Sequence, residues 1–213
     1  MKAIVFGATG LIGTSLTRQL AAHPACSSVV TVGRRNAFDD LDKVSHQIVD
    51  FDNLGAHASQ ITGDVLFSTL GTTKKQAGSI AAQRVVDVDY QLAVAKIAAK
   101  NKIPHFVLVS SSGADAASRN PYLKMKGELE TAIRQLPFER ISILQPSLLL
   151  GPRQPARGGE LAAQWILPLF TWLPTLQKYR PIHCDVVASK MIAVHQMQAS
   201  ALETYRLDDV FNA

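Results

Sequence analysis

The chain has 213 residues, of which 47% are hydrophobic and 18% are charged. A disordered chain is poorer in apolar residues, so this composition excludes intrinsic disorder and predicts an ordinary globular domain. The formal net charge of +5 comes from basic residues scattered in pairs, without the long basic run that nucleic-acid binding favours. We therefore expect no nucleic-acid partner.

Three further features bear on the compartment. The longest apolar stretch, residues 161–176, is too short to span a membrane and is interrupted by Pro168 and Pro174. The chain runs straight into a strand pattern, so we expect no signal peptide. Cys26 and Cys184 form neither a disulfide framework nor a metal-binding pattern, which favours a reducing compartment. These features predict a cytoplasmic protein without a membrane span.

The first predicted elements are a short strand, a glycine-rich turn and a helix. Residues 3–6 are apolar, and Gly7, Gly10 and Gly13 follow them with GxxGxxG spacing. Apolar residues then recur at helical spacing. Such a turn lets a pyrophosphate approach bare backbone at a helix N-terminus, although a purely structural turn is the alternative. The predicted cofactor contacts of this segment are Gly7, Thr9, Gly10, Leu11, Ile12 and Gly13.

The second predicted strand, residues 28–32, ends at Gly33-Arg34-Arg35. In dinucleotide-binding sheets this point lies beside the adenosine ribose, where an acidic residue accepts from the 2′-hydroxyl of NAD and arginine accommodates the 2′-phosphate of NADP. A guanidinium bonds phosphate bidentately. Arg34 and Arg35 therefore favour NADP(H) over NAD, and two solvated loop arginines are the alternative.

Two more predicted strands cover residues 46–49 and 64–70. Asp50 and Phe51 follow the first of them, where they could contact the adenine, although a plain loop carboxylate fits Asp50 equally well. The second is almost continuously apolar, as a strand buried on both faces of a parallel sheet should be. Open α/β sheets bind ligands at the carboxyl ends of their strands, so we add Leu70, Gly71 and Thr72 to the cofactor contacts.

The remaining patterns are a helix over 79–101, a strand over 105–109, a helix over 122–136 and a strand over 141–144. This alternation predicts an α/β fold: a doubly wound, mostly parallel Rossmann-type sheet with helices on both faces and strand order 3-2-1-4-5-6. We expect one domain over 1–213. Within it, residues 151–213 are predicted to form a loop-rich, partly helical substrate cap with a helix near 185–198.

Candidate catalytic groups follow the fifth predicted strand. A serine run, 110–112, ends the strand, and Tyr122 and Lys126 stand four residues apart on the next predicted helix, hence on one face. An ammonium beside a phenol stabilises the phenolate, and a serine hydroxyl can hold a substrate carbonyl. YxxxK alone is usually an ordinary helix face. Its position after the serine-tipped strand and the glycine turn favours hydride transfer coupled to proton transfer.

These motifs resemble the short-chain dehydrogenase/reductase superfamily in its extended or atypical branch. More specifically, the chain is similar to the small NADPH-binding oxidoreductases related to the Tat-interacting protein, to at least Arg153. The similarity rests on Leu70-Gly71-Thr72-Thr73, Val88-Asp89-Tyr90, Ser110-Ser111, Gly113-Ala114-Asp115, Tyr122-Leu123 and Lys126-Gly127-Glu128. The resemblance implies a catalytic set of Ser111, with Ser112 as the alternative, Tyr122 and Lys126. It also implies that Pro146, Leu148 and Leu149 pass the nicotinamide carboxamide.

We therefore expect an NADPH-dependent oxidoreductase acting on a small carbonyl or alcohol. Two alternatives stay open: a non-catalytic NADPH sensor that contacts a protein partner, and an epimerase or isomerase that retains its cofactor. The segment from Trp165 to Trp172 could wall the substrate pocket, form a homodimer face or complete the core. No metal site is expected at His183-Cys184-Asp185, because consecutive strand residues alternate faces, and Asp185 is expected to cap a helix.

Overall fold

The computed structural model describes residues 1–151 and 179–211. Two predictions lie outside the described residues: the use of the segment from Trp165 to Trp172, and the part of the substrate cap over 152–178.

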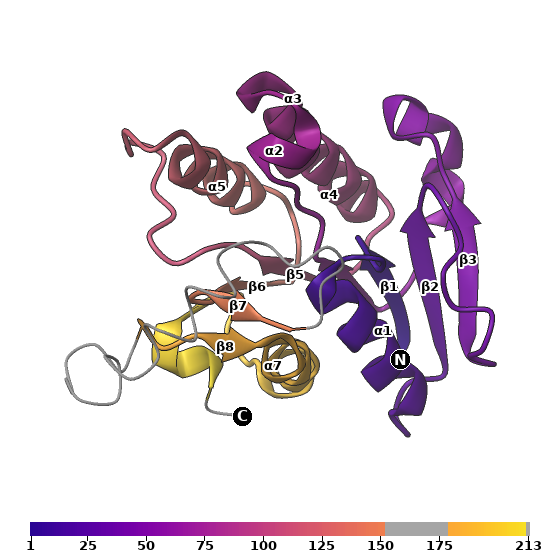
Figure 1. Ribbon diagram of the computed structural model, residues 1–213. Helices are drawn as coiled ribbons and strands as arrows, with labels where there is room; N and C mark the ends of the chain where they lie inside the picture. The colour runs from indigo at the N-terminus through magenta and orange to yellow at the C-terminus, as the bar shows by residue number, and fades with distance from the viewer. Residues whose placement is uncertain (152–178, 212–213) are drawn as a thin grey trace.

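Seven parallel strands form the central sheet, in the order β3-β2-β1-β4-β5-β6-β9 (Figure 1). They are β1 (Lys2–Phe6), β2 (Ser28–Gly33), β3 (Val44–Ile48), β4 (Val65–Ser68), β5 (His105–Val109), β6 (Arg140–Gln145) and β9 (Leu202–Arg206). The predicted doubly wound fold and the order 3-2-1-4-5-6 are confirmed, and β9 extends the sheet by one strand. A second small sheet pairs β7 (Leu149–Leu150) with β8 (Ile182–His183).

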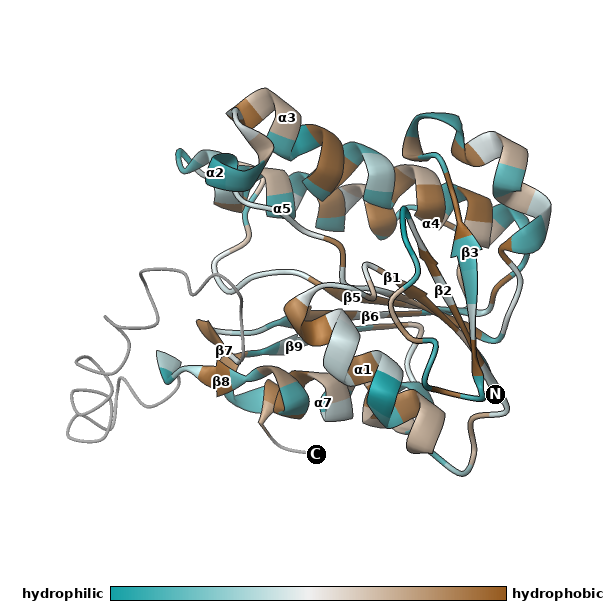
Figure 2. Cartoon of the chain, turned by 45° about the vertical axis from the view of Figure 1, so that its right-hand side comes forward, coloured by the Kyte–Doolittle hydropathy of each residue, from teal (hydrophilic) through white to brown (hydrophobic). Residues whose placement is uncertain are grey.

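Helices cover both faces of the central sheet (Figure 2). One layer consists of α1 (Leu11–Ala22) and α7 (Cys184–Met197). The other consists of α2 (Lys74–Ala77), α3 (Ile80–Arg84), the π-helical turn η2 (Val85–Asp89), α4 (Tyr90–Lys100) and α5 (Pro121–Ile133). Two 3₁₀ segments, η1 (Phe51–Gln60) and η4 (Leu207–Val210), complete the described elements.

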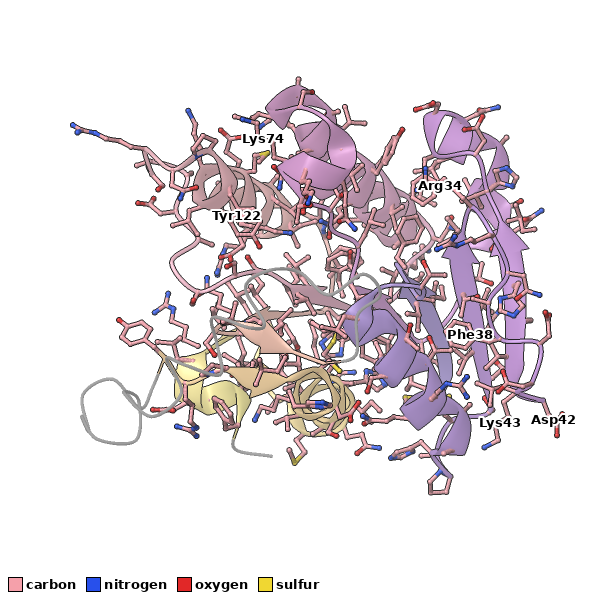
Figure 3. The ribbon with its side chains drawn as sticks, viewed as in Figure 1. Arg34, Phe38, Asp42, Lys43, Lys74 and Tyr122 are labelled. Carbon is pink, nitrogen blue, oxygen red and sulfur yellow. The ribbon has the colours of Figure 1, made fainter. Side chains whose placement is uncertain are left out.

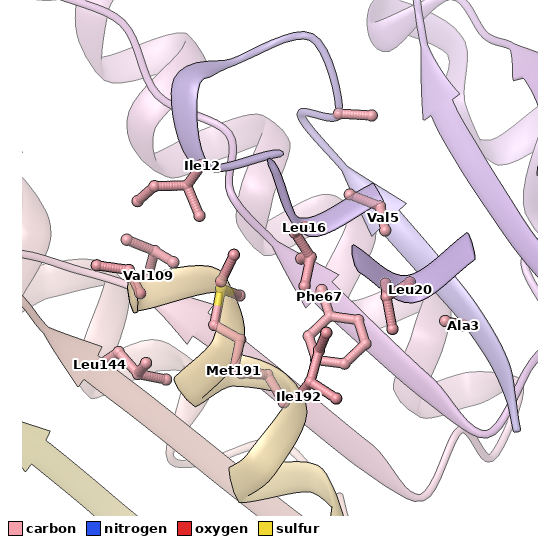
Figure 4. Packing of buried hydrophobic residues seen from close by; sticks show 14 of the residues in the cluster. Ala3, Val5, Ile12, Leu16, Leu20, Phe67, Val109, Leu144, Met191 and Ile192 are labelled. Carbon is pink, nitrogen blue, oxygen red and sulfur yellow. The ribbon is translucent and has the colours of Figure 1, made fainter. Parts of the chain in front are cut away.

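The sheet separates two apolar cores. The core on the α1 and α7 side surrounds the buried ring of Phe67 from β4, with Leu16 of α1 and Met191 of α7 among its members (Figure 4). The core on the other side includes Phe106 of β5 and Leu129 of α5. Burial on both faces explains why the central strands are almost entirely apolar.

Within the cap expected over 151–213, the described residues 179–211 include elements that belong to the main sheet and its helical layer. The helix near 185–198 is confirmed as α7, but it packs beside α1 on one face of the sheet (Figures 1 and 2), and β9 pairs with β6. The physical reason is apolar burial: Val187, Met191 and Val194 of α7 are fully buried there. Across residues 1–151 and 179–211, no helix combines the length and apolar character needed to cross a membrane.

Candidate cofactor cleft and active site

The glycine turn between β1 and α1 is tight enough to require glycine at two positions. Gly7 has a φ of +84°, and a Cβ there would lie 2.6 Å from the backbone nitrogen of Leu70. A Cβ on Gly13 would lie 2.2 Å from the carbonyl oxygen of Gly7. Gly10 is the N-cap of α1 and offers no side chain to its first N–H groups. The turn therefore presents bare backbone at a helix N-terminus, as a dinucleotide pyrophosphate needs.

A cleft of about 370 Å³ opens beside this turn, at the carboxyl ends of β1 and β2. Its lining includes six of the residues predicted to contact the cofactor: Gly7, Thr9, Arg34, Arg35, Phe51 and Leu70. The sequence interpretation missed the rest of the lining: Ala8, Thr31, Val32, Gly33, Ala37 and Phe38. Ala8 lies in the glycine turn between two predicted residues, and the other five belong to β2 or to the loop that follows it.

Two exposed arginines stand at the end of β2 (Figure 3 labels Arg34). Among the described residues, neither Arg34 nor Arg35 forms an ion pair with a carboxylate. An arginine that already held a carboxylate would be a poorer phosphate ligand. Their guanidinium groups are therefore available to an anion in the cleft.

Phe51 forms one wall of the cleft within an aromatic cluster. Its ring centroid lies 5.3 Å from that of Phe6 and 4.9 Å from that of Tyr90. The Tyr90 hydroxyl donates to Oδ1 of Asp52 at 2.6 Å, and this bond raises the pKa of Tyr90. Asp50 also has a local role, because its carboxylate caps η1 by accepting from the backbone N–H of Asp52 at 3.0 Å.

The pair predicted on α5 does lie together. The ammonium nitrogen of Lys126 is 5.9 Å from the ring centroid of Tyr122, whose side chain is exposed (Figure 3). Lys126 is buried and forms an ion pair with Asp87, with Nζ 2.9 Å from Oδ1. The other oxygen of Asp87 accepts from the backbone N–H of Thr72 at 3.1 Å. The α5 pair is thus tied to the Gly71-Thr72 turn after β4, through a carboxylate that the sequence interpretation did not single out.

The serines of the run differ in burial and in hydrogen-bond partners. Ser110 is buried and donates to the carboxylate of Glu130. Ser111 is half-buried, and its hydroxyl donates to the carbonyl of Ser112 at 3.4 Å, with no hydrogen bond to Tyr122 in the described structure. The backbone N–H of Ser112 donates to the carbonyl of Pro146 at 3.0 Å, which joins the run to the loop after β6.

That loop approaches the start of α1. Pro146 is buried, Leu148 is exposed, and Leu149 begins β7. A Cβ on the following Gly151 would lie 2.7 Å from Cδ1 of Leu11. The glycine turn, the serine run and the loop after β6 therefore meet at the carboxyl edge of the sheet.

His183, Cys184 and Asp185 differ from the sequence expectation. The N-cap of α7 is His183 rather than Asp185, and Nδ1 of His183 accepts from the backbone N–H of Asp185. The three possible ligand atoms lie within 4.8 Å of one another, because the chain passes from β8 into a helix instead of continuing as a strand. Burial raises the pKa of the Cys184 thiol, which disfavours the thiolate that metals bind.

Comparison with known proteins identifies the family. A family model described as NAD(P)H-binding matches residues 7–159. The chain is also 38% identical over 164 residues to protein HTATIP2 from Rattus norvegicus, across 75% of this chain and 67% of that protein. The chain belongs to the NAD(P)H-binding family. The family membership expected from the glycine turn and the Tyr122 motif is thereby confirmed.

Other members and structural neighbours agree with this assignment. Protein FMP52, mitochondrial, from Saccharomyces cerevisiae is 40% identical over 172 residues, across 76% of this NAD(P)H-binding chain and 74% of that protein. MoeE5 in complex with UDP-glucose and NAD has a TM-score of 0.71 at 14% identity, covering 99% of this chain and 79% of that one. UDP-glucuronic acid 4-epimerase from Bacillus cereus in complex with NAD has a TM-score of 0.69 at 16% identity, covering 96% and 78%. At this identity the two structures support the Rossmann-type fold alone.

Proposed function

We propose that this chain is an NADP(H)-dependent oxidoreductase that transfers hydride to or from a small carbonyl or alcohol. The observation that carries the proposal is the pairing of Tyr122 and Lys126 on one face of α5, with the ammonium 5.9 Å from the phenol ring. The serine run and the Gly71-Thr72 turn lie at the same edge of the sheet. Family membership supports nicotinamide dinucleotide binding.

The residues of the cleft fit such a cofactor. Gly7 and Gly13 leave no room for a Cβ, so the backbone is accessible to a pyrophosphate. The guanidinium groups of Arg34 and Arg35, which hold no carboxylate within residues 1–151 and 179–211, support NADP(H) over NAD, because they would bind the 2′-phosphate. When bound, the nicotinamide supplies or accepts the hydride.

The chain's own residues would handle the proton and the substrate oxygen. Tyr122 would donate a proton to the oxygen as a carbonyl is reduced, and accept it in the reverse direction. Lys126 would stabilise the phenolate and bond the nicotinamide ribose. Ser111 would donate a hydrogen bond to the carbonyl and polarise it.

The decisive experiment replaces Tyr122 by Phe and follows NADPH consumption with a panel of aldehydes and ketones. The expected result is loss of turnover with the Kd for NADPH nearly unchanged, because the ring remains and only the hydroxyl is lost. Tyr205→Phe, which removes a hydroxyl on β9 at the sheet edge, is the control and should keep its activity. Turnover retained by Tyr122→Phe would contradict the assignment.

A second candidate is a non-catalytic NADPH-binding protein whose cofactor occupancy regulates contact with a protein partner. The observation that favours it is the commitment of Lys126 to Asp87, which leaves the ammonium shared between a carboxylate and the phenol. This candidate requires tight NADPH binding, no turnover across the panel and a partner affinity that changes with nucleotide. A cofactor-retaining epimerase, the activity that the name of one fold neighbour gives, would instead interconvert isomers without net NADPH consumption.

We also propose a cytoplasmic location and a small-molecule substrate. Both cysteines are buried and unpaired, which suits a reducing compartment. The fungal FMP52 relatives carry the word mitochondrial in their names, so the mitochondrion is the competing location. Fractionation of cells that express a tagged full-length chain distinguishes the two.

A further inference from the structure

Asp87 stands at a break in the long helical stretch after β4. The turn η2, Val85–Asp89, is π-helical between two α-helical segments, α3 and α4. π-turns inside helices are rare and frequently mark functional sites. The Asp87 side chain is 1% exposed, so its carboxylate is removed from water and requires bonding partners within the protein.

Two elements far apart in the sequence supply those partners. Lys126 of α5 bonds one oxygen at 2.9 Å, and the backbone N–H of Thr72 bonds the other at 3.1 Å. A Cβ on Gly71 would lie 3.2 Å from the Asp87 carboxylate and 3.9 Å from the Lys126 ammonium. The turn after β4 therefore approaches the ion pair closely.

The backbone of Asp87 is held as well. Its carbonyl accepts from the side-chain amide of Gln91 at 2.8 Å, and the amide oxygen of Gln91 accepts from the hydroxyl of Ser68 at 2.8 Å. Gln91 is fully buried and Ser68 is the last residue of β4. Hydrogen bonds thus connect both the side-chain carboxylate and the backbone carbonyl of Asp87 to the carboxyl end of β4, which borders the cofactor cleft.

We propose that Asp87 is a positioning residue that holds the Lys126 ammonium beneath Tyr122 and locks it to the Gly71-Thr72 turn. This inference rests on the proposed function, in which Lys126 serves Tyr122. A buried ammonium without a counter-ion loses its charge or moves toward water. With Asp87 present, the ammonium stays charged and at a fixed place relative to the phenol and the turn.

A surface ion pair within the same helical layer provides a matched control. Arg84 of α3 pairs with Glu128 of α5, and their side chains are 46% and 28% exposed. Lys124 also approaches Glu128, at 4.0 Å. Water screens these charges, so their loss should change the site little. The contrast between the two ion pairs separates a positioning role from general helix attachment.

The test is a double-mutant cycle on the full chain with Asp87→Asn, Lys126→Met, the double variant and Glu128→Gln. If Asp87 acts through Lys126, each single substitution lowers kcat by about tenfold or more, and the double variant loses no more than Lys126→Met does. Glu128→Gln should stay within about twofold of the wild type. The pH–rate profile of Asp87→Asn should fall earlier on its alkaline side, since its ammonium has lost its counter-ion.

Losses that multiply in the double variant, or an unchanged kcat in Asp87→Asn, would overturn the inference. If Asp87→Asn does not fold, the double variant, which carries no charge at either position, is compared with Lys126→Met, which leaves the buried Asp87 carboxylate without its counter-ion. A lower kcat in the double variant would then count against positioning. If the wild type reduces no carbonyl, the proposed reductase fails separately. The Kd for NADPH is then measured for the same set of variants. Additive effects of Asp87→Asn and Lys126→Met on this Kd overturn the inference, and non-additive effects support it.

Discussion

The Nδ1 atoms of His105 and His195 lie 2.9 Å apart, although 90 residues separate the two in the chain. Nε2 of His105 is 2.8 Å from the hydroxyl of Ser142, and that hydroxyl donates to the amide oxygen of Gln198. Because the Gln198 amide nitrogen donates to two backbone carbonyls, the direction of the chain follows: His195 donates to His105, which donates to Ser142. Both imidazoles are neutral in this arrangement, and they fasten α7 to the start of β5.

We expect this contact to make the fold sensitive to acid. Burial, followed by the charge of Arg140, lowers the pKa of His105 from 6.5 to about 3 and that of His195 to about 4. The unfolded chain binds protons below pH 6.5 while the folded chain does not, so the stability is fully present above pH 6.5 and is lost toward pH 3. The loss should approach about 1.4 kcal/mol per pH unit for His105 and be smaller for His195, which water partly screens.

Urea unfolding between pH 7 and 4 measures this loss. His195→Gln, which can still donate to His105, should flatten the dependence on pH by up to one proton. His57→Gln, in η1 and remote from α7, is the control and should keep the wild-type slope. An equal slope in all three proteins would show that the histidine pair does not set the acid sensitivity.

A second prediction concerns the glycine turn. Gly13→Ala places a Cβ 2.2 Å from the carbonyl oxygen of Gly7 and 2.8 Å from Cα of Ala8, and such backbone atoms cannot move aside as a flexible side chain can. We expect a loss of about 1–3 kcal/mol in the free energy of unfolding and at least about tenfold weaker NADPH binding. Gly55→Ala, where a Cβ meets nothing within 4 Å, is the matched control. Unfolding curves and nucleotide titrations of the two variants check this, and equal behaviour would contradict a tight turn.

Local signals account for most of what the sequence predicts correctly. Gly7 and Gly13 predict the turn, because only glycine tolerates such close contacts. The alternation of apolar strand patterns with helix patterns along the chain predicts the doubly wound sheet. The sequence does not predict strand β9, because Leu202–Arg206 is only partly buried and so lacks a continuous apolar pattern. It also lies within the loop-rich segment from which a cap is expected. Its pairing with β6 is a long-range contact that no local pattern encodes.

In the candidate site, too, local spacing is predictable from the sequence and long-range contacts are not. The spacing of Tyr122 and Lys126 predicts a shared helix face, since residues four apart on a helix are neighbours. The partner of Lys126 could not be predicted, because Asp87 lies 39 residues away and reaches it from a π-turn, which has no sequence signature. Arg34 follows a strand and is found by position, whereas Phe38 reaches the cleft only through the fold of its loop.

A third prediction tests the choice between nucleotides. Arg34→Ala/Arg35→Ala should weaken NADPH binding by about tenfold to a hundredfold, toward the affinity for NADH, because bidentate bonds to the 2′-phosphate are lost. Binding of NADH, which lacks that phosphate, should change by less than about threefold. Titrations with NADPH, NADP, NADH and NAD measure both effects. An equal loss for NADPH and NADH would assign the arginines to general electrostatics rather than to the phosphate.

The last prediction concerns Glu130, which is buried behind the serine run. Its carboxylate accepts from Ser110 and, at 2.8 and 3.0 Å, from the amide nitrogen of Gln145, while Arg134 lies 3.5 Å away. Glu130→Gln puts an amide against the donors that the carboxylate satisfies, which should cost about 1–3 kcal/mol of unfolding free energy. Because Ser110 precedes Ser111, we also expect a lower kcat with little change in the Kd for NADPH.

The control in both assays is Glu139→Gln, which changes an exposed glutamate just before β6. Wild-type stability in Glu130→Gln would mean that the buried network does not fix the end of β5.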